Sequence, residues 1–120
     1  MIKPGIAYKI NKIVSSADTA TAYGSGMVEV FATPSMIALM EETALKSVEP
    51  FLTEDQTTVG FEVNIKHFKA VKVGEEVISS CRLSEVNERK LTFNVKVLHD
   101  GETVGKGKHV RYIVNKNQFV

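Results

Sequence analysis

The sequence predicts an α+β fold in which one long helix packs on a curved, mostly antiparallel sheet. Two observations support this class. Only one long stretch, residues 33–49, has helical periodicity, whereas the other apolar stretches alternate with a period of two, as half-buried strands do. Turn signals, including the pair Asp100-Gly101, separate the alternating stretches, so consecutive strands should pair antiparallel.

Two strands are expected before the helix. The first runs from Ile6 to Val14 and is followed by turn-forming residues at positions 15–19. The second is expected to end over the stretch Gly26 to Val30.

The helix has clear start and stop signals. Thr33 is predicted to be its N-cap and Pro34 its first residue, where a missing N–H removes no hydrogen bond. Pro50 should end it, because the residue before a proline avoids the helical region. Glu41 lies at the edge of the apolar face, where solvation gives no reason for a carboxylate. That face consists of Met36, Ile37, Met40, Ala44 and Val48.

Four strands are predicted after the helix. The first is a long alternating one that places Val59, Phe61, Val63, Ile65 and His67 on a single side. The next two cover Val77 to Leu83 and Leu91 to Val97, and the last follows Asp100-Gly101 and ends near Val114. The predicted order is therefore β-β-α-β-β-β-β in one domain, residues 1–120. A helix with a wide apolar arc inside a curved sheet is the hotdog arrangement, and unpaired outer strands favour dimerisation.

Composition excludes several classes of function. Of the 120 residues, 15 are basic and 14 acidic, and this near-balance argues against nucleic acid as a partner. No apolar run is long enough to span a bilayer, so no membrane partner is expected. A single cysteine, Cys81, and the absence of a signal-peptide pattern predict a cytoplasmic protein. No Cys/His spacing resembles a metal site, and no cofactor is expected.

Three residues could carry chemistry. Glu41 could act as a general base or nucleophile, although a helix-edge glutamate could equally face solvent or a partner chain. His67 ends a strand in phase with apolar residues and could be an acid or base; alternatively it is a partly buried histidine bonded to backbone. Thr33 is explained by helix capping alone, yet a helix N-terminus also favours a developing oxyanion.

A basic stretch lies late in the chain, at Lys106, Lys108, His109 and Arg111. Such a stretch is usually one solvated strand face. It could also meet the phosphates of a coenzyme A.

The sequence resembles the fluoroacetyl-CoA thioesterase-like branch of the hotdog superfamily, from about Gly26 to Val114. Eight positions separate Thr33 from Glu41, and 26 separate Glu41 from His67, as in that family's Thr/Glu/His set. The motifs that carry the resemblance are Ala32-Thr-Pro-Ser-Met-Ile-Ala-Leu-Met-Glu41, Val59-Gly-Phe-Glu-Val-Asn-Ile-Lys-His67, Val73-Gly-Glu-Glu-Val77 and Lys108-His-Val-Arg-Tyr-Ile-Val114.

The resemblance implies an acyl-CoA thioesterase without metal or redox cofactor, acting as a homodimer with its site between subunits. Glu41 would attack the thioester or activate water, His67 would be the general acid/base, and Thr33 would hold Glu41 or the substrate. Gly60 would bring its backbone N–H close to the acyl carbonyl. Arg111 would match an arginine near the ligand.

The resemblance also bears on the substrate. Where the fluoroacetate enzyme has an aromatic gate, this chain has Met27, a flexible residue, which favours a short or medium acyl group, branched ones included, over a fluorinated one. Met36, Met40 and Phe61 are expected to line the acyl pocket. The alternative function is a non-catalytic acyl-CoA-binding or regulatory module. A hydratase would need an Asp/His pair that the sequence does not offer.

Overall fold

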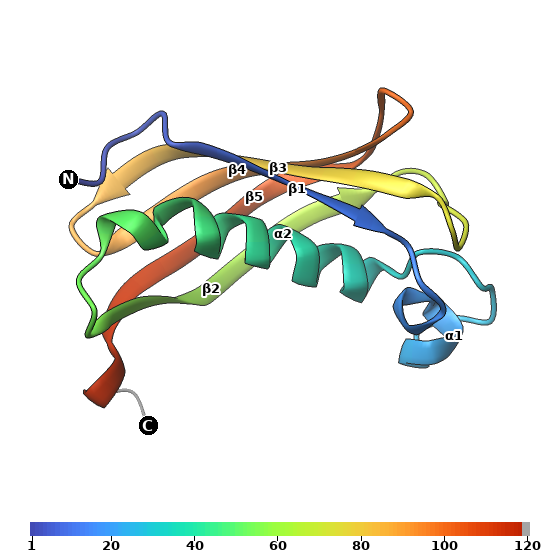
Figure 1. The fold of residues 1–120 in the computed structure, drawn as a ribbon, viewed down its shortest axis with the longest axis horizontal. Coiled ribbons are helices and arrows are strands. Elements are labelled where there is room, and N and C mark those ends of the chain that lie inside the picture. Colours follow the sequence, from blue (N-terminus) through green and yellow to red (C-terminus); the bar gives the residue numbers. More distant parts are fainter. Residues whose placement is uncertain (119–120) are drawn as a thin grey trace.

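A computed structural model describes residues 1–118, in which one long helix lies across one face of a five-stranded antiparallel sheet (Figure 1). The sheet order is β1-β3-β4-β5-β2, so β1 and β2 form its two edges. The elements are β1 (Ala7–Ile13), η1 (Ser16–Asp18), α1 (Ala20–Tyr23), α2 (Thr33–Val48), η2 (Glu49–Phe51), β2 (Gln56–His67), β3 (Glu76–Asn87), β4 (Lys90–His99), β5 (Glu102–Asn115) and η3 (Lys116–Gln118).

The core lies between α2 and the face of the sheet that it covers, which we call the inner face. Met36, Met40, Ala44 and Val48 of α2 are fully buried, as the helical periodicity predicted, whereas Ile37 is only half-buried. Alternate residues of β3 and β4 meet them, including Val77, Leu83, Phe93 and Val97. Within the described residues, neither helix is long and apolar enough to cross a bilayer.

The predicted strand over Gly26 to Val30 is wrong, and the sheet has five strands instead of six. Thr19 caps the short helix α1 by accepting a hydrogen bond from the Ala22 N–H, and Gly24 ends it in the left-handed conformation (φ 71°). The chain then reaches α2 through single bridges at Val30 and Phe31. Because residues 20–23 are helical and residues 27–28 bend, only the isolated bridge at Val30 remains of the expected strand.

The predicted capping role of Thr33 is also wrong. Ala32 is the N-cap, Thr33 is already helical, and the first turn closes through the Met36 N–H on the Ala32 carbonyl at 2.9 Å. Asp18 fixes this entrance instead, since its carboxylate accepts a hydrogen bond from the Ser35 hydroxyl at 3.0 Å. The Thr33 hydroxyl is thus free to bond elsewhere.

The strict alternation predicted for β2 is broken by a bulge between Gly60 and Glu62. Thr58 and Gly60 face α2 before the bulge, and Ile65 and His67 face it afterwards. One extra residue shifts the side-chain phase by one. Phe61 consequently lies on the opposite, outer face, where its ring packs edge-on against Tyr112 at 5.0 Å between centroids.

The predicted turns and remaining strands are confirmed. Asp100 and Gly101 both have positive φ (49° and 78°), as a two-residue hairpin between β4 and β5 requires. Glycine also matters inside β5, because a Cβ at Gly105 would lie 2.6 Å from the Met36 side chain. The absence of a side chain there lets Met36 sit directly against the sheet.

Candidate active site

The first polar cluster lies at the N-terminus of α2, where Thr33 meets the last residue of β2. The Thr33 Oγ1 and the His67 Nδ1 are 2.8 Å apart. The imidazole is partly buried against the edge of the Phe31 ring, at 6.4 Å between centroids. Its Nε2 is buried and has no hydrogen-bond partner among the described residues. One ring nitrogen therefore has a hydrogen-bond partner, and the other has none among the described residues.

Burial favours the uncharged form of this histidine. Desolvation of the ring lowers the pKa of His67 below its ordinary value of 6.5 and outweighs a backbone hydrogen bond that acts in the opposite direction. A hollow of about 340 Å³ adjoins the pair, walled by Thr33, Pro34, His67 and Phe68 among others. The cluster thus combines a neutral imidazole, a hydroxyl and room for a small group.

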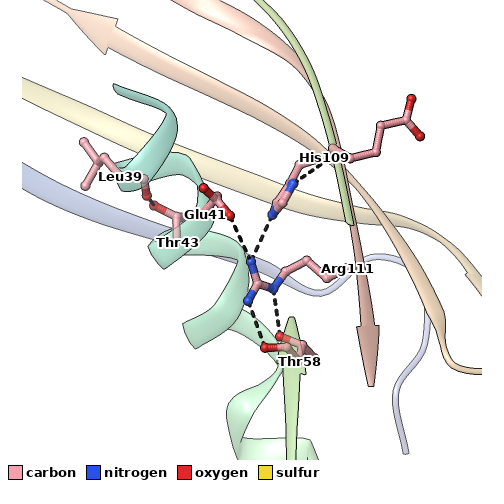
Figure 2. A network of polar contacts seen from close by, with 7 residues as sticks. Leu39, Glu41, Thr43, Thr58, His109 and Arg111 are labelled. Carbon is pink, nitrogen blue, oxygen red and sulfur yellow. Dashed lines mark hydrogen bonds and ion pairs between the residues drawn. The ribbon is translucent and has the colours of Figure 1, made fainter. Parts of the chain in front are cut away.

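The second cluster lies in the middle of α2, around Glu41 (Figure 2). Its Oε2 is 3.7 Å from the Nη1 of Arg111 on β5, and the Glu41 side chain is 40% exposed. Gly60 on β2 faces the same carboxylate, because a Cβ built there would lie 2.7 Å from Oε2. Only glycine allows this approach without moving the carboxylate.

Arg111 is buried and held on several sides (Figure 2). Its Nε donates to the Thr58 hydroxyl at 2.8 Å, and its Nη2 donates to the Thr58 carbonyl at 2.9 Å. Burial lowers the pKa of Arg111 from its ordinary value, and the Glu41 carboxylate opposes that shift. Because arginine remains protonated in proteins, Arg111 presents a fixed positive charge to Glu41.

His109 completes this cluster from the same strand. Its Nδ1 lies 2.8 Å from the Glu62 carbonyl oxygen, which can only accept, so Nδ1 carries the proton. Its Nε2 then accepts from the Arg111 Nη1 at 3.1 Å. Burial, helped by the nearby Arg111 charge, lowers the pKa of His109 and keeps the ring neutral. Every nitrogen of this imidazole has a partner.

The chain does not bring Glu41 into contact with Thr33 or His67. Thr33 and Glu41 lie eight residues apart on one helix, which is about 12 Å of axial rise. The hydrogen bond at the helix N-terminus joins Thr33 only to His67, and the ion pair in mid-helix joins Glu41 only to Arg111. Each chain therefore has two separate polar clusters along α2.

Comparison with known proteins places the chain in a family. The sequence profile described as fluoroacetyl-CoA-specific thioesterase, FlK, matches residues 14–117. The chain belongs to this family. A fluoroacetyl-CoA thioesterase from Streptantibioticus cattleyicolor is 32% identical over 92 residues, which cover 76% of this chain. The match spans 66% of that relative's length.

Solved structures show that the fold is a hotdog, because a hot-dog-like protein from Thermanaerovibrio acidaminovorans superposes with a TM-score of 0.89 at 20% identity, covering 98% of this chain and 87% of its own. The fluoroacetyl-CoA thioesterase FlK superposes with a TM-score of 0.92 at 24% identity, over 99% of this chain and 93% of its own. A variant of FlK solved with fluoroacetate and CoA gives the same TM-score and identity, covering 99% and 100%. A thioesterase superfamily member from Thermus thermophilus gives a TM-score of 0.90 at 22% identity, covering 98% and 88%.

The three residues expected to line the acyl pocket, and Met27 at the expected gate position, lie apart within this FlK-family chain. Met36 and Met40 are fully buried in the core, while Met27 is 95% exposed in the loop before α2. Phe61 is 66% exposed on the outer face because of the β2 bulge. Gly60 and Arg111, by contrast, both lie beside Glu41.

The interpretation of the late basic stretch as one solvated strand face is wrong. Lys106 and Lys108 are exposed, whereas His109 and Arg111 are buried toward α2. The structure adds Thr58 and His109 to the Glu41 cluster. The one sequence signal that could have placed His109 in this cluster is its spacing of two residues from Arg111, which puts both side chains on one face of the strand. Nothing in the sequence indicated that Thr58 would meet Arg111, because the two lie 53 positions apart.

Proposed function

We propose that this protein hydrolyses an acyl-CoA to the free acid and CoA, using Thr33, Glu41 and His67. Membership of the FlK family and the placement of Glu41 beside the buried Arg111 support the proposal. The proposed substrate carries a short or medium acyl group rather than a fluorinated one, since the loop before α2 carries the flexible Met27.

In the proposed reaction a water oxygen adds to the thioester carbonyl carbon, and the carbon–sulfur bond then breaks. Glu41 accepts the proton of the attacking water, and the Arg111 charge keeps its carboxylate in place. When Nδ1 of His67 donates to the Thr33 hydroxyl, its Nε2 can accept that proton from Glu41 and pass it to the departing thiolate, so both groups return to their starting forms. Thiolates are good leaving groups, so no metal is needed.

The observation that carries the proposal further is the separation between the two polar clusters along α2. About 12 Å of helix lies between Thr33 and Glu41, which is too far for both to touch one thioester directly. We propose a homodimer in which Glu41 of one subunit meets the Thr33–His67 pair of its partner. The long edge strand β2 has an unpaired side that suits such an association.

The test is release of CoA thiol from short, branched and aromatic acyl-CoAs by wild-type protein and two variants. Glu41→Gln should lower kcat by roughly 10²- to 10⁴-fold, the usual contribution of a general base. Glu42→Gln is the matched control, because Glu42 is adjacent, exposed and paired only with Lys46. Equal turnover by Glu41→Gln and wild type would reject the assignment.

The same experiment separates the alternative function. A non-catalytic acyl-CoA-binding module would bind acyl-CoA but release no thiol in any of the three proteins. Binding measured by calorimetry alongside the thiol assay distinguishes that result from a protein that does not recognise acyl-CoA.

A further inference from the structure

The outer face of the sheet carries a second concentration of charge, unconnected with Glu41. Lys9, Lys96, Lys106 and Lys66 belong to one cross-strand row that runs through Ser80, and Arg82 and Lys108 belong to the next row. We call these six residues the lysine face. All six are exposed, and they account for six of the 15 basic residues on a chain whose net charge is only +1.

Within residues 1–118, none of these six cations forms an ion pair. Lys96, Lys106 and Lys66 are direct cross-strand neighbours, and adjacent strands lie about 4.8 Å apart. Like charges placed directly opposite one another destabilise a sheet. Such an arrangement therefore favours an anion that lies across β4, β5 and β2 and relieves the repulsion.

The shape of this face limits the size of the anion. The two rows border a hollow of about 860 Å³, the size of a small-molecule site. Beyond Lys108 and Arg82, the next cross-strand row carries the exposed carboxylates Glu62 and Glu85. A duplex or a membrane extending past the two rows would meet those carboxylates. A second copy of the chain would bring identical cations together. A compact, multiply charged ligand fits best.

The lysine face is connected to the proposed active site through one residue. Phe68 follows His67 and is 51% exposed, and it lines both the outer hollow and the 340 Å³ hollow beside Thr33 and His67. A ligand whose thioester lies at the Thr33–His67 pair can therefore extend past the Phe68 ring onto the outer face. Lys69 lines the smaller hollow itself but is paired with Glu102, so Lys66, on the other side of His67 in the sequence, is the first unpaired cation that the ligand would reach.

We propose that the lysine face binds the phosphates of the nucleotide half of acyl-CoA, with Phe68 marking the passage from the thioester. This inference rests on the proposed thioesterase function but is tested by binding, without turnover. Phosphates carry the several negative charges that three adjacent ammonium groups can neutralise. A free nucleotide has the same chemistry, so the experiment must distinguish the two sources.

The test compares Lys96→Gln/Lys106→Gln with the control Lys3→Gln/Lys116→Gln, which removes two exposed charges elsewhere. Calorimetry should show CoA affinity falling roughly five- to tenfold in the first variant, as expected for two lost charge contacts. The control should match wild type, and raising the salt should reduce the difference. Affinity for pantetheine, which lacks the nucleotide, should be the same in all three proteins.

Several results would overturn the proposal. Equal CoA affinity in the two double variants would remove the lysine face from CoA binding. ATP that binds with the same lysine dependence but does not compete with CoA would assign the face to a free nucleotide. Lysine-dependent binding of duplex DNA or anionic vesicles, without effect on CoA, would assign it to a macromolecular partner.

Failure of the proposed function would look different from these outcomes. Lysine-dependent CoA binding with no thiol release would leave the binding site intact and reject only the hydrolysis. In an active enzyme, the Lys96→Gln/Lys106→Gln variant should raise KM for acyl-CoA while kcat/KM for the acyl-pantetheine thioester stays unchanged.

Discussion

The two polar clusters along α2 differ in how completely their groups are paired. Around Glu41, the guanidinium of Arg111 reaches Thr58, His109 and the carboxylate, and both ring nitrogens of His109 have partners. At the helix N-terminus, His67 has one partner and an unpaired buried Nε2 beside a hollow. A paired network holds a charge in place, whereas the buried Nε2 of His67 keeps a hydrogen-bonding capacity that no described residue satisfies.

The largest expected effect comes from an experiment that tests whether the two clusters act together across subunits. Glu41→Gln and His67→Asn should each be nearly inactive alone. If each site combines Glu41 of one subunit with His67 of the other, a mixed dimer of the two variants contains one site without either change. An equal, re-equilibrated mixture should then recover about a quarter of wild-type turnover, since roughly half the dimers are mixed and one site in two is intact.

The control for this experiment is the same mixture kept from exchanging subunits. No recovery after exchange, in a mixture shown by mass spectrometry to contain mixed dimers, would mean that each site lies within one chain. Glu41 and the Thr33–His67 pair of the same chain would then have to come together by a movement of α2 rather than by dimer assembly.

A smaller effect is expected from adding a methyl group beside Glu41. In Gly60→Ala the new Cβ would lie 2.7 Å from the Glu41 Oε2, so the carboxylate must turn away from its position near Arg111. We expect kcat to fall roughly 10- to 100-fold, because a misplaced general base loses most of its contribution. The urea midpoint should change little, since a half-exposed side chain can move.

The matched control is Gly74→Ala. A Cβ at Gly74 meets nothing within 4 Å, but its φ of 93° strains any other residue, so this variant should lose stability and keep activity. Loss of stability without loss of turnover in Gly60→Ala would contradict the close approach to Glu41.

The smallest effect concerns the pH dependence of stability. The pKa of His109 is lowered on folding, so the unfolded chain binds more protons as the pH falls through 6.5. The contribution of the neutral ring is thus fully present above that pH and is lost as the pH falls toward the lowered pKa of the folded state. Each unit of lowering corresponds to about 1.4 kcal/mol.

In His109→Gln the decline in the free energy of unfolding between pH 7.5 and pH 5 should therefore be shallower than in wild type. Urea denaturation at several pH values measures it. The pKa of His67 is lowered in the same direction and that of His99 is raised. The effect of His109 should therefore be taken as the difference between variant and wild type, in which the other two histidines are unchanged. An identical slope in variant and wild type would show that His109 is not held neutral.

Much of the fold could be predicted from the sequence because its signals are local. Pro34 and Pro50 bracket the helix within two residues, and Asp100-Gly101 forms the expected hairpin. The predictions that failed rested on local signals that are compatible with two different structures. Thr33 is a good N-cap type, but the Ala32 backbone took that position and left the hydroxyl for His67. The alternation in β2 gave no sign of the bulge, because one extra residue looks the same as another in a sequence.

The sequence by itself determined the helix, the pairing of consecutive strands after it and the family's Thr/Glu/His spacing, because each depends on nearby residues or on a pattern along the chain. Only the tertiary structure decided that Arg111, bonded to His109, pairs with Glu41, that Phe61 lies on the outer face, and that six cations gather on one face. These depend on strand register and on a single bulge, which bring together residues far apart in the sequence and set which face each side chain meets.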